Sequence, residues 1–156
     1  MNFIEIGRIH TPHKQAAGTP IQPTRATGIE GSIIVHPDYV DGLKDLDGFD
    51  RIWLVFWCDR ATPAEMQVIP YRDTVSRGLF ATRAPARPNP IGLSCVRLGG
   101  IDGNRLTIFD VDMLDGTPLL DIKPYVPEYD TFEAQRCGWI DAASTAVRVA
   151  DSRFQR

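Results

Sequence analysis

The sequence predicts a mainly β fold, either an antiparallel barrel or a sandwich, with two or three short helices. Runs rich in Ile, Val, Trp and Phe recur along the chain, and these residue types favour strands. Loops containing Pro and Gly separate the runs, whereas a parallel sheet would need a full helix between strands. Neither G-x-G-x-x-G nor G-x-x-x-x-G-K-[ST] occurs, so no Rossmann-type or P-loop nucleotide site is indicated.

The first part of the chain predicts two strands separated by a long loop. Apolar and polar residues alternate over 3–9, which is the period of a strand. Residues 10–27 are polar and contain three prolines, and a loop of this length in a small domain is usually functional or mobile. Residues 30–36 predict the second strand, and 37–42 predict a single helical turn.

An aromatic-rich run, RIWLVFWC at 51–58, predicts a buried strand. Its eight residues are too few for a typical buried helix, and β-branched and aromatic side chains dominate them. We therefore expect core positions for Trp53, Phe56 and Trp57.

The second half of the chain predicts both strands and short helices. Residues 93–98 and 105–111 predict two strands, and the Asp-Gly pair at 102–103 is a strong hairpin signal between them. Residues 115–125 predict a turn followed by a short edge strand. Beyond them we expect a short helix at 129–137 and a terminal helix at 141–153, with a strand at 146–150 as the alternative to the second helix.

The most informative stretch is LFATRAPARPNPIGLS, residues 79–94. It contains Arg83, Arg87 and three prolines, but no acidic residue. Proline fixes φ and removes a backbone donor, so the stretch predicts a stiff extended loop and neither a helix interior nor a central strand. A stiff polar loop loses little entropy when a ligand binds, and an arginine within it can hold a carboxylate through two hydrogen bonds.

Three polar loops are candidates for a binding site. Asp112 and Asp115 could accept hydrogen bonds from hydroxyl or amino groups, and with Arg83 they would suit a small zwitterionic ligand bearing hydroxyls. For both aspartates, and most of all for Asp115 before Gly116, the alternative is turn chemistry, in which the side chain bonds its own backbone. The three loops lie at 18–22, 79–94 and 110–125.

Composition excludes a generic polyanion binder. The 156 residues carry a net charge of −3 with a pI of about 5.5, whereas non-specific nucleic-acid binding needs clustered positive charge. Positive charge is nevertheless concentrated over 72–97, where five arginines accompany the single acid Asp73. This run is either a solvated basic face or, given its prolines and Asn89, a ligand-contacting segment.

Cysteine, histidine and hydropathy patterns add three expectations. The three cysteines form no C-x-x-C pair and indicate reduced thiols. The three histidines show no zinc spacing, so we expect no metal site. No apolar run approaches the ~18 residues of a membrane span, and the start of the chain has no signal-peptide pattern, so we expect a cytoplasmic protein.

Two long motifs and two shorter ones resemble those of a known family. They are similar to the tRNA methyltransferase O family, also called the TsaA-like or YaeB-like family, over roughly residues 3–130. The chain looks like a short member in which 1–156 form one domain, with a core at about 3–130 and a C-terminal extension at 131–156. The motifs are FATRAPARPNPIGLS at 80–94, DGTPLLDIKPYVP at 115–127, IGRIHTP at 6–12 and FDRIWLVFW at 49–57.

The resemblance implies a fold, a cofactor and a substrate. The fold is a small antiparallel or mixed β-barrel with a few short helices, outside the Rossmann and knotted classes. It binds S-adenosylmethionine, as a homodimer with the cofactor near the interface. Characterised members methylate N6 of threonylcarbamoyladenosine at position 37 of certain tRNAs.

Where the motifs match, the resemblance also implies which positions of this sequence contact the cofactor. Two positions depart from the family pattern: Ile21 stands in place of an arginine, so one polar contact is lost or supplied by Arg25, and Asp59 stands in place of a histidine. The carried-over positions are Pro20, Ile21, Gln22, Asp59, Arg60, Arg83, Leu93, Asp112, Met113, Leu114 and Asp115.

Three functions are compatible with this sequence. The first is an S-adenosylmethionine-dependent tRNA methyltransferase, in which Asp112, Asp115 or Tyr125 removes the proton from the acceptor nitrogen. The second is an S-adenosylmethionine-binding protein with a non-tRNA acceptor or a sensing role. The third is an interaction domain in which the arginine-containing loop at 79–94 binds an acidic protein. In the first, the phosphate-contacting candidates are Arg72, Arg77, Arg87 and Lys123.

Overall fold

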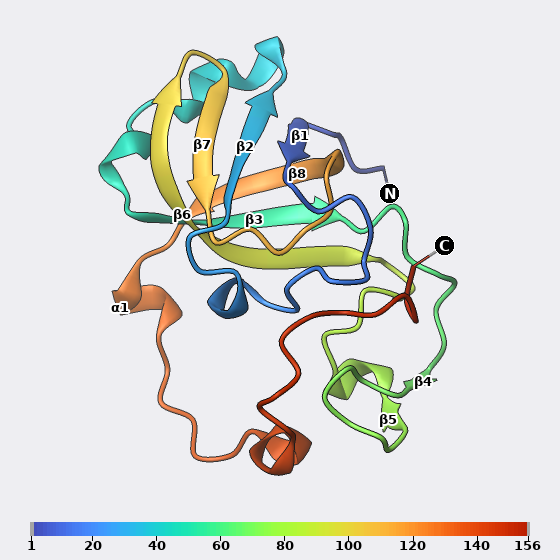
Figure 1. Ribbon diagram of the computed structural model, residues 1–156. Helices are drawn as coiled ribbons and strands as arrows, with labels where there is room; N and C mark the ends of the chain where they lie inside the picture. Colours follow the sequence, from blue (N-terminus) through green and yellow to red (C-terminus); the bar gives the residue numbers. More distant parts are fainter. Residues whose placement is uncertain (1, 156) are drawn as a thin grey trace.

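Within residues 2–155, which the computed structural model describes, six strands close into a barrel in which every pairing is antiparallel. Their order around the barrel is β1-β2-β7-β6-β3-β8 (Figure 1). The predicted antiparallel barrel is therefore confirmed. The strands are β1 (Gly7–His10), β2 (Glu30–Val35), β3 (Arg51–Trp57), β6 (Ile91–Asp102), β7 (Arg105–Phe109) and β8 (Thr117–Pro124).

Alternate side chains of the strands fill the barrel. On β3, Ile52, Leu54 and Phe56 are buried, whereas the residues between them lie on the outer face and are only half-buried. Trp53 and Trp57 belong to that outer face, so the expectation that they lie in the core is wrong. The reason is the two-residue period of a strand, which allows only one of two adjacent aromatic residues to point inward.

Short elements complete the chain. A two-stranded sheet joins β4 (Gln67–Val68) to β5 (Arg77–Gly78), and α1 (Pro127–Asp130) is a single turn. Short 3-10 segments lie at Pro23–Arg25, Pro37–Leu43, Leu46–Gly48, Leu79–Ala81 and Gly138–Ala142. Among residues 2–155, none of the helices combines the length and apolar character that crossing a membrane requires.

Five sequence expectations were wrong in detail. The first strand covers Gly7–His10 and not 3–9, because regular pairing with β2 and β8 begins at Gly7. The expected edge strand at 115–125 is instead β8, which pairs with β1 on one side and β3 on the other. Barrel closure removes edges, and this long-range pairing leaves no local trace in the sequence.

The proline run and the C-terminal region also differ. Residues 79–90 contain a 3-10 turn and irregular loop, but Ile91 already begins β6, because the last proline of the run is Pro90. The helix expected at 129–137 is only the four-residue α1, and the helix expected at 141–153 is absent from the described chain. In that last region Val149 forms a β-bridge with Pro20, which favours the extended alternative.

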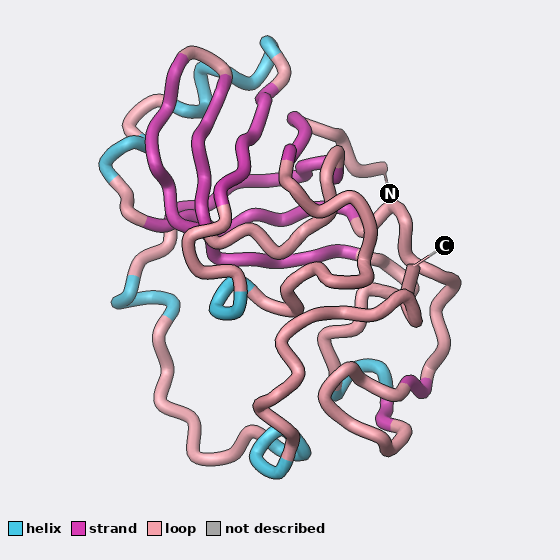
Figure 2. Tube along the Cα trace, viewed as in Figure 1, coloured by secondary structure: helices cyan, strands magenta, loops and turns pink. Residues whose placement is uncertain are grey.

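Loops form a second layer beside the barrel. Figure 2 shows the strands gathered in the upper part of the molecule and mostly loops below them. A separate apolar cluster holds this layer together: Val68, Leu79, Ala84, Ala86 and Phe154, with Tyr71 packed against it.

Candidate functional site

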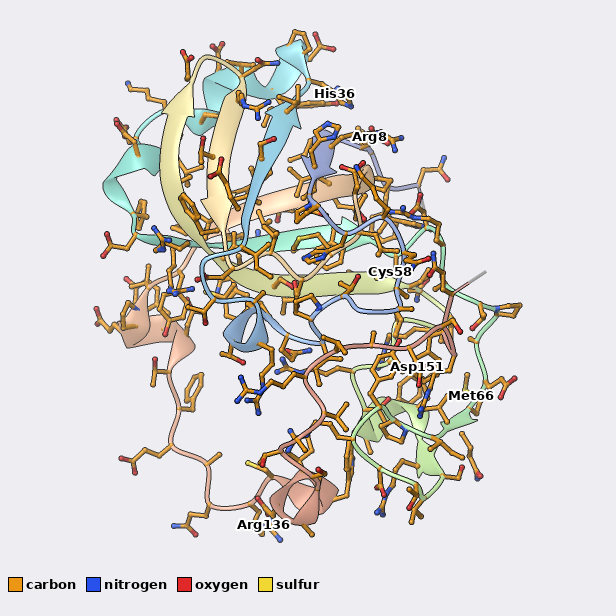
Figure 3. The ribbon with its side chains drawn as sticks, in the orientation of Figure 1. Arg8, His36, Cys58, Met66, Arg136 and Asp151 are labelled. Atoms are coloured by element: carbon orange, nitrogen blue, oxygen red, sulfur yellow. The ribbon has the colours of Figure 1, made fainter. Side chains whose placement is uncertain are left out.

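A cavity of about 410 Å³ lies between the barrel and the second layer. Its walls come from the loop at 19–22, the end of β3, the segment 82–87, the beginning of β6 and the segment 112–114. Cavities of this size with mostly apolar walls and a few polar groups are typical of small-molecule sites. Figure 3 labels Cys58 at the end of β3, next to the place where the second layer meets the barrel.

The fold brings most of the sequence-predicted cofactor residues together on this cavity. Asp115 is the exception, since it lies outside the lining. The residues that line the cavity are Pro20, Ile21, Gln22, Asp59, Arg60, Arg83, Leu93, Asp112, Met113 and Leu114. Five segments far apart in the sequence therefore contribute to one site.

Arg83 joins two of the walls. Its Nη1 donates a hydrogen bond to Oε1 of Gln22 at 2.7 Å, which is its one hydrogen-bond partner among residues 2–155. The residue is exposed, and its charge also acts on the Asp112 carboxyl group. The remaining N–H groups of the guanidinium are therefore available to a ligand carboxylate, in the forked geometry that arginine favours.

Asp112 has the most perturbed carboxyl group of the site. Burial raises its pKa to about 7, although a hydrogen bond from the Ser94 hydroxyl at 2.7 Å and the charge of Arg83 both act to lower it. A carboxyl group with a pKa near neutrality can accept a proton at physiological pH. Because it is ionised only in part at that pH, it also responds strongly to a nearby positive charge.

The backbone turn that positions Asp112 is built around Asp110. Asp110 adopts a left-handed conformation with φ of 70°. Its carboxylate accepts a hydrogen bond from the Gly28 amide at 2.8 Å and forms an ion pair with Arg51 at 3.0 Å. These contacts stabilise a conformation that non-glycine residues rarely adopt, and they direct the following residues onto the cavity wall.

Asp115 and Tyr125, the other two candidate bases, are engaged elsewhere. Asp115 accepts a hydrogen bond from Lys14 at 2.6 Å and one from the Thr11 amide at 3.0 Å, and the Lys14 hydrogen bond is the main reason that its pKa is lowered. The Tyr125 hydroxyl lies 3.1 Å from that of Thr131, and Tyr125 does not line the cavity.

The four cationic candidates for phosphate contact all have intramolecular partners. Arg72 donates to backbone carbonyls in the C-terminal region, and Arg87 donates to backbone carbonyls of its own loop. Arg77 and Lys123 each pair with an aspartate, at 2.8 and 2.7 Å. Arg87 is the one of the four that lines the cavity.

Several cavity residues were missed by sequence reasoning. The indole N–H of Trp53 is buried without a hydrogen-bond partner within the described chain, and Trp53 lines the cavity. Ser94 ends the proline-rich motif, and that position was the one available signal for it. Phe154 and Gln155 lie near the end of the chain, where no motif marks them.

Cys58 also lines the cavity, and its surroundings disfavour the thiolate form. Burial is the main reason that its pKa is raised, to about 12. A thiol with such a pKa stays protonated near neutral pH and is a poor nucleophile. All three cysteines are free, with Cys58 and Cys95 half-buried and Cys137 exposed.

Comparison with known proteins identifies the family. A family model described as the tRNA-methyltransferase O N-terminal domain matches residues 8–131. The chain belongs to this family. The tRNA-methyltransferase O resemblance of its proline-rich and aspartate-containing motifs is thereby confirmed.

Three relatives illustrate the breadth of the tRNA-methyltransferase O family. A Pyrococcus abyssi protein, named a probable S-adenosyl-L-methionine-binding protein, is 53% identical over 151 residues, which is 96% of this chain and 82% of that protein. The mouse tRNA (adenine(37)-N6)-methyltransferase is 35% identical over 81% of this chain. A crystal structure of TrmO from Pseudomonas aeruginosa superposes with a TM-score of 0.78 at 37% identity, covering 92% of this chain. The chain spans only 31% of the mouse enzyme and 64% of the Pseudomonas chain.

Proposed function

We propose that this chain is an S-adenosylmethionine-dependent methyltransferase that acts on N6 of threonylcarbamoyladenosine 37 in tRNA. The observation that carries the proposal is the 410 Å³ cavity, in which the Arg83 guanidinium and the Asp112 carboxyl group accompany apolar walls. The family membership and the names of the relatives support both the cofactor and the tRNA substrate.

The residues on the cavity fit the proposed cofactor. The Arg83 guanidinium suits the carboxylate of its amino-acid part, and the Asp112 carboxylate suits an amino group, a hydroxyl or a positive charge. Phe56, Leu93 and Met113 supply apolar surface, and the unpaired indole N–H of Trp53 is a donor without an acceptor. A buried donor of this kind costs free energy unless a ligand or water accepts from it.

The chain's own contribution to the reaction would be orientation and proton removal. The cofactor supplies a methyl group activated by positively charged sulfur. Asp112 is the proposed proton acceptor, because its pKa is near 7 and it lines the cavity. The site would hold the acceptor nitrogen in line, and such positioning accounts for much of the rate gain in a two-reactant step.

A labelled-methyl transfer assay tests the function. Purified protein is incubated with labelled cofactor and bulk tRNA that lacks the N6-methyl group, and nuclease digestion then locates the label. We expect label on the modified adenosine at position 37. No transfer to any tRNA, with cofactor binding intact, would reject the tRNA substrate.

That outcome would favour a second candidate, an S-adenosylmethionine-binding protein with another acceptor or a sensing role. The observation behind it is that all four predicted phosphate-contacting side chains have intramolecular partners, in a chain of net charge −3.

We also propose a homodimer in the cytoplasm, where its tRNA substrate is found. Phe3, Ile91 and Leu93 are 46, 36 and 57% exposed, and the last two lie on the same face of β6. Leu93 also lines the cavity, so a second copy seated there would approach the ligand.

Sedimentation should give twice the monomer mass, and Phe3→Asp should shift the protein towards the monomer. A monomeric wild-type protein at micromolar concentration would contradict the homodimer.

A further inference from the structure

The last residues of the chain form a strap, residues 148–155, that connects the walls of the cavity. At its start, residues 148–150 pair with residues 18–21 through three backbone hydrogen bonds of 2.8 to 3.1 Å. Gln22, which receives the hydrogen bond from Arg83, follows directly after that loop. The strap therefore pairs with one wall of the site by the same bonding that joins strands.

The end of the strap holds a second wall. The Thr62 amide donates to the Phe154 carbonyl at 3.0 Å, and the Ala16 amide donates to Oε1 of Gln155 at 2.6 Å. Arg153 donates to the backbone carbonyls of residues 69 and 70. The strap thus joins the loop before β2 to the segment that follows β3.

Phe154 connects the strap to the third wall. Its ring is 8% exposed and packs in the apolar cluster with Leu79, Ala84 and Ala86, on either side of Arg83. It also packs edge-on against Tyr71, with ring centroids 5.2 Å apart. Phe154 is therefore part of the support of the loop that presents Arg83.

The first part of the connection between the barrel and the strap is exposed to solvent. Residues 131–138 are all exposed, and Phe132 is 85% exposed. Figure 1 shows this segment leaving α1, swinging below the barrel and returning as the strap, and Figure 3 places Arg136 on its outermost part. The residues between this segment and the strap are anchored again, because the Trp139 indole N–H donates to the Ala81 carbonyl and Arg72 donates to the carbonyls of residues 143 and 144. Beyond them, the strap docks through the contacts with the cavity walls described above.

We propose that the strap is part of the ligand site, with Phe154 and Gln155 as binding residues, and that strap docking and ligand binding reinforce each other. Phe154, Gln155 and Ala150 line the same cavity as Arg83 and Asp112. If a ligand binds more tightly when the strap is docked, the strap must dock more tightly when the ligand is bound. This inference rests on the proposed S-adenosylmethionine site and lies outside residues 8–131 that the family model matches.

The test compares Phe154→Ala with Phe132→Ala by calorimetric titration of S-adenosylmethionine. Phe154→Ala should raise the Kd about tenfold or more, which is a change of about 1.4 kcal/mol or more. Phe154→Leu should restore most of the affinity, and Phe132→Ala should leave it unchanged. If Phe154→Ala does not fold, Gln155→Ala replaces it, with a weaker affinity expected in the same direction.

Limited trypsin digestion measures whether the cofactor protects the strap from cleavage. A strap with a purely structural role would be cleaved at the same rate with and without the cofactor. S-adenosylmethionine should slow cleavage after Arg148 and Arg153 in the wild type, and should leave cleavage after Arg136 unchanged. An unchanged Kd in Phe154→Ala, or equal cleavage with and without the cofactor, would overturn the proposal for the strap alone. A wild-type protein that does not bind the cofactor at all would overturn both the proposed function and this inference.

Discussion

Arg83 connects two loops and still offers N–H groups to a ligand. Its substitution should therefore weaken the binding of a ligand that carries a carboxylate. We predict that Arg83→Ala weakens S-adenosylmethionine binding by about 1.5–3 kcal/mol, the range for a hydrogen bond to a charged group. Arg83→Lys should recover only part of this, because an ammonium cannot bond a carboxylate as a planar fork. Calorimetric titration measures the loss.

Arg105→Ala is the matched control for Arg83. Arg105 is an exposed arginine at the start of β7 that does not line the cavity. Its substitution should leave the Kd unchanged. Equal affinities for wild type and Arg83→Ala would show that the ligand's carboxylate binds elsewhere.

Asp112 should make cofactor binding depend on pH. Its pKa is about 7 in the folded protein, against an ordinary value of 3.8. A positively charged ligand binds the ionised carboxylate, so affinity should rise by up to about tenfold per pH unit between pH 5 and 7 and level off above. Asp112→Asn should flatten this slope. A slope that is the same in both proteins would show that another group titrates.

The same carboxyl group has the opposite effect on folding stability. Because its pKa is raised in the folded state, the folded protein holds the proton more tightly than the unfolded chain. The stability gained from that proton is present below pH 4 and is lost as pH rises towards 7. The melting temperature of wild type relative to Asp112→Asn should therefore fall over this range, which thermal unfolding at several pH values measures.

At the scale of elements, β6 carries the cavity wall. Gly92 lies opposite Phe56 of β3, and a Cβ atom at position 92 would overlap the Phe56 ring. We predict that Gly92→Ala displaces this ring, costs about 1–3 kcal/mol of stability as overpacking does, and weakens cofactor binding. Chemical denaturation and titration measure the two effects.

Gly100→Ala on the same strand is the control. A Cβ atom there meets nothing within 4 Å. Its stability and affinity should stay close to those of the wild type. If Gly92→Ala binds the cofactor normally, the Phe56 ring does not shape the site.

Local pattern predicted the elements of the barrel but not all of their boundaries. Alternation and aromatic content located β2, β3 and β7, and the Asp-Gly pair located the hairpin between β6 and β7. The terminal helix was wrong because residues 148–150 find backbone partners in residues 18–21. Such partners lie far away in the sequence, so local propensity cannot detect them.

At the scale of the whole molecule, a net charge of −3 makes tRNA binding depend on a few local arginines and lysines. If Arg72, Arg77, Arg87 and Lys123 all met phosphates, affinity for an anticodon stem-loop should fall about a hundredfold from 50 to 200 mM salt. A much smaller decrease is expected if their present partners are retained, and the fluorescence anisotropy of a labelled stem-loop distinguishes the two cases. An affinity independent of salt would exclude phosphate contacts altogether.

The sequence by itself determined the β class, the hairpin and the segments that carry polar chemistry. These features depend on residues that are neighbours in the chain: strand periodicity, the Asp-Gly turn, and prolines beside Arg83. Motifs at 80–94 and 115–127 also indicated the family, and the resemblance to that family carried over several of the residues that line the cavity.

Only the tertiary structure decided which of those residues share a site and in what state of charge. The raised pKa of Asp112 depends on burial. The engagement of Asp115 by Lys14 depends on the pairing of β1 with β8, which brings together two segments about a hundred residues apart. The joining of the cavity walls by Phe154 is likewise a property of packing. Burial and long-range contact are set by the whole folded chain, so no local pattern can encode them.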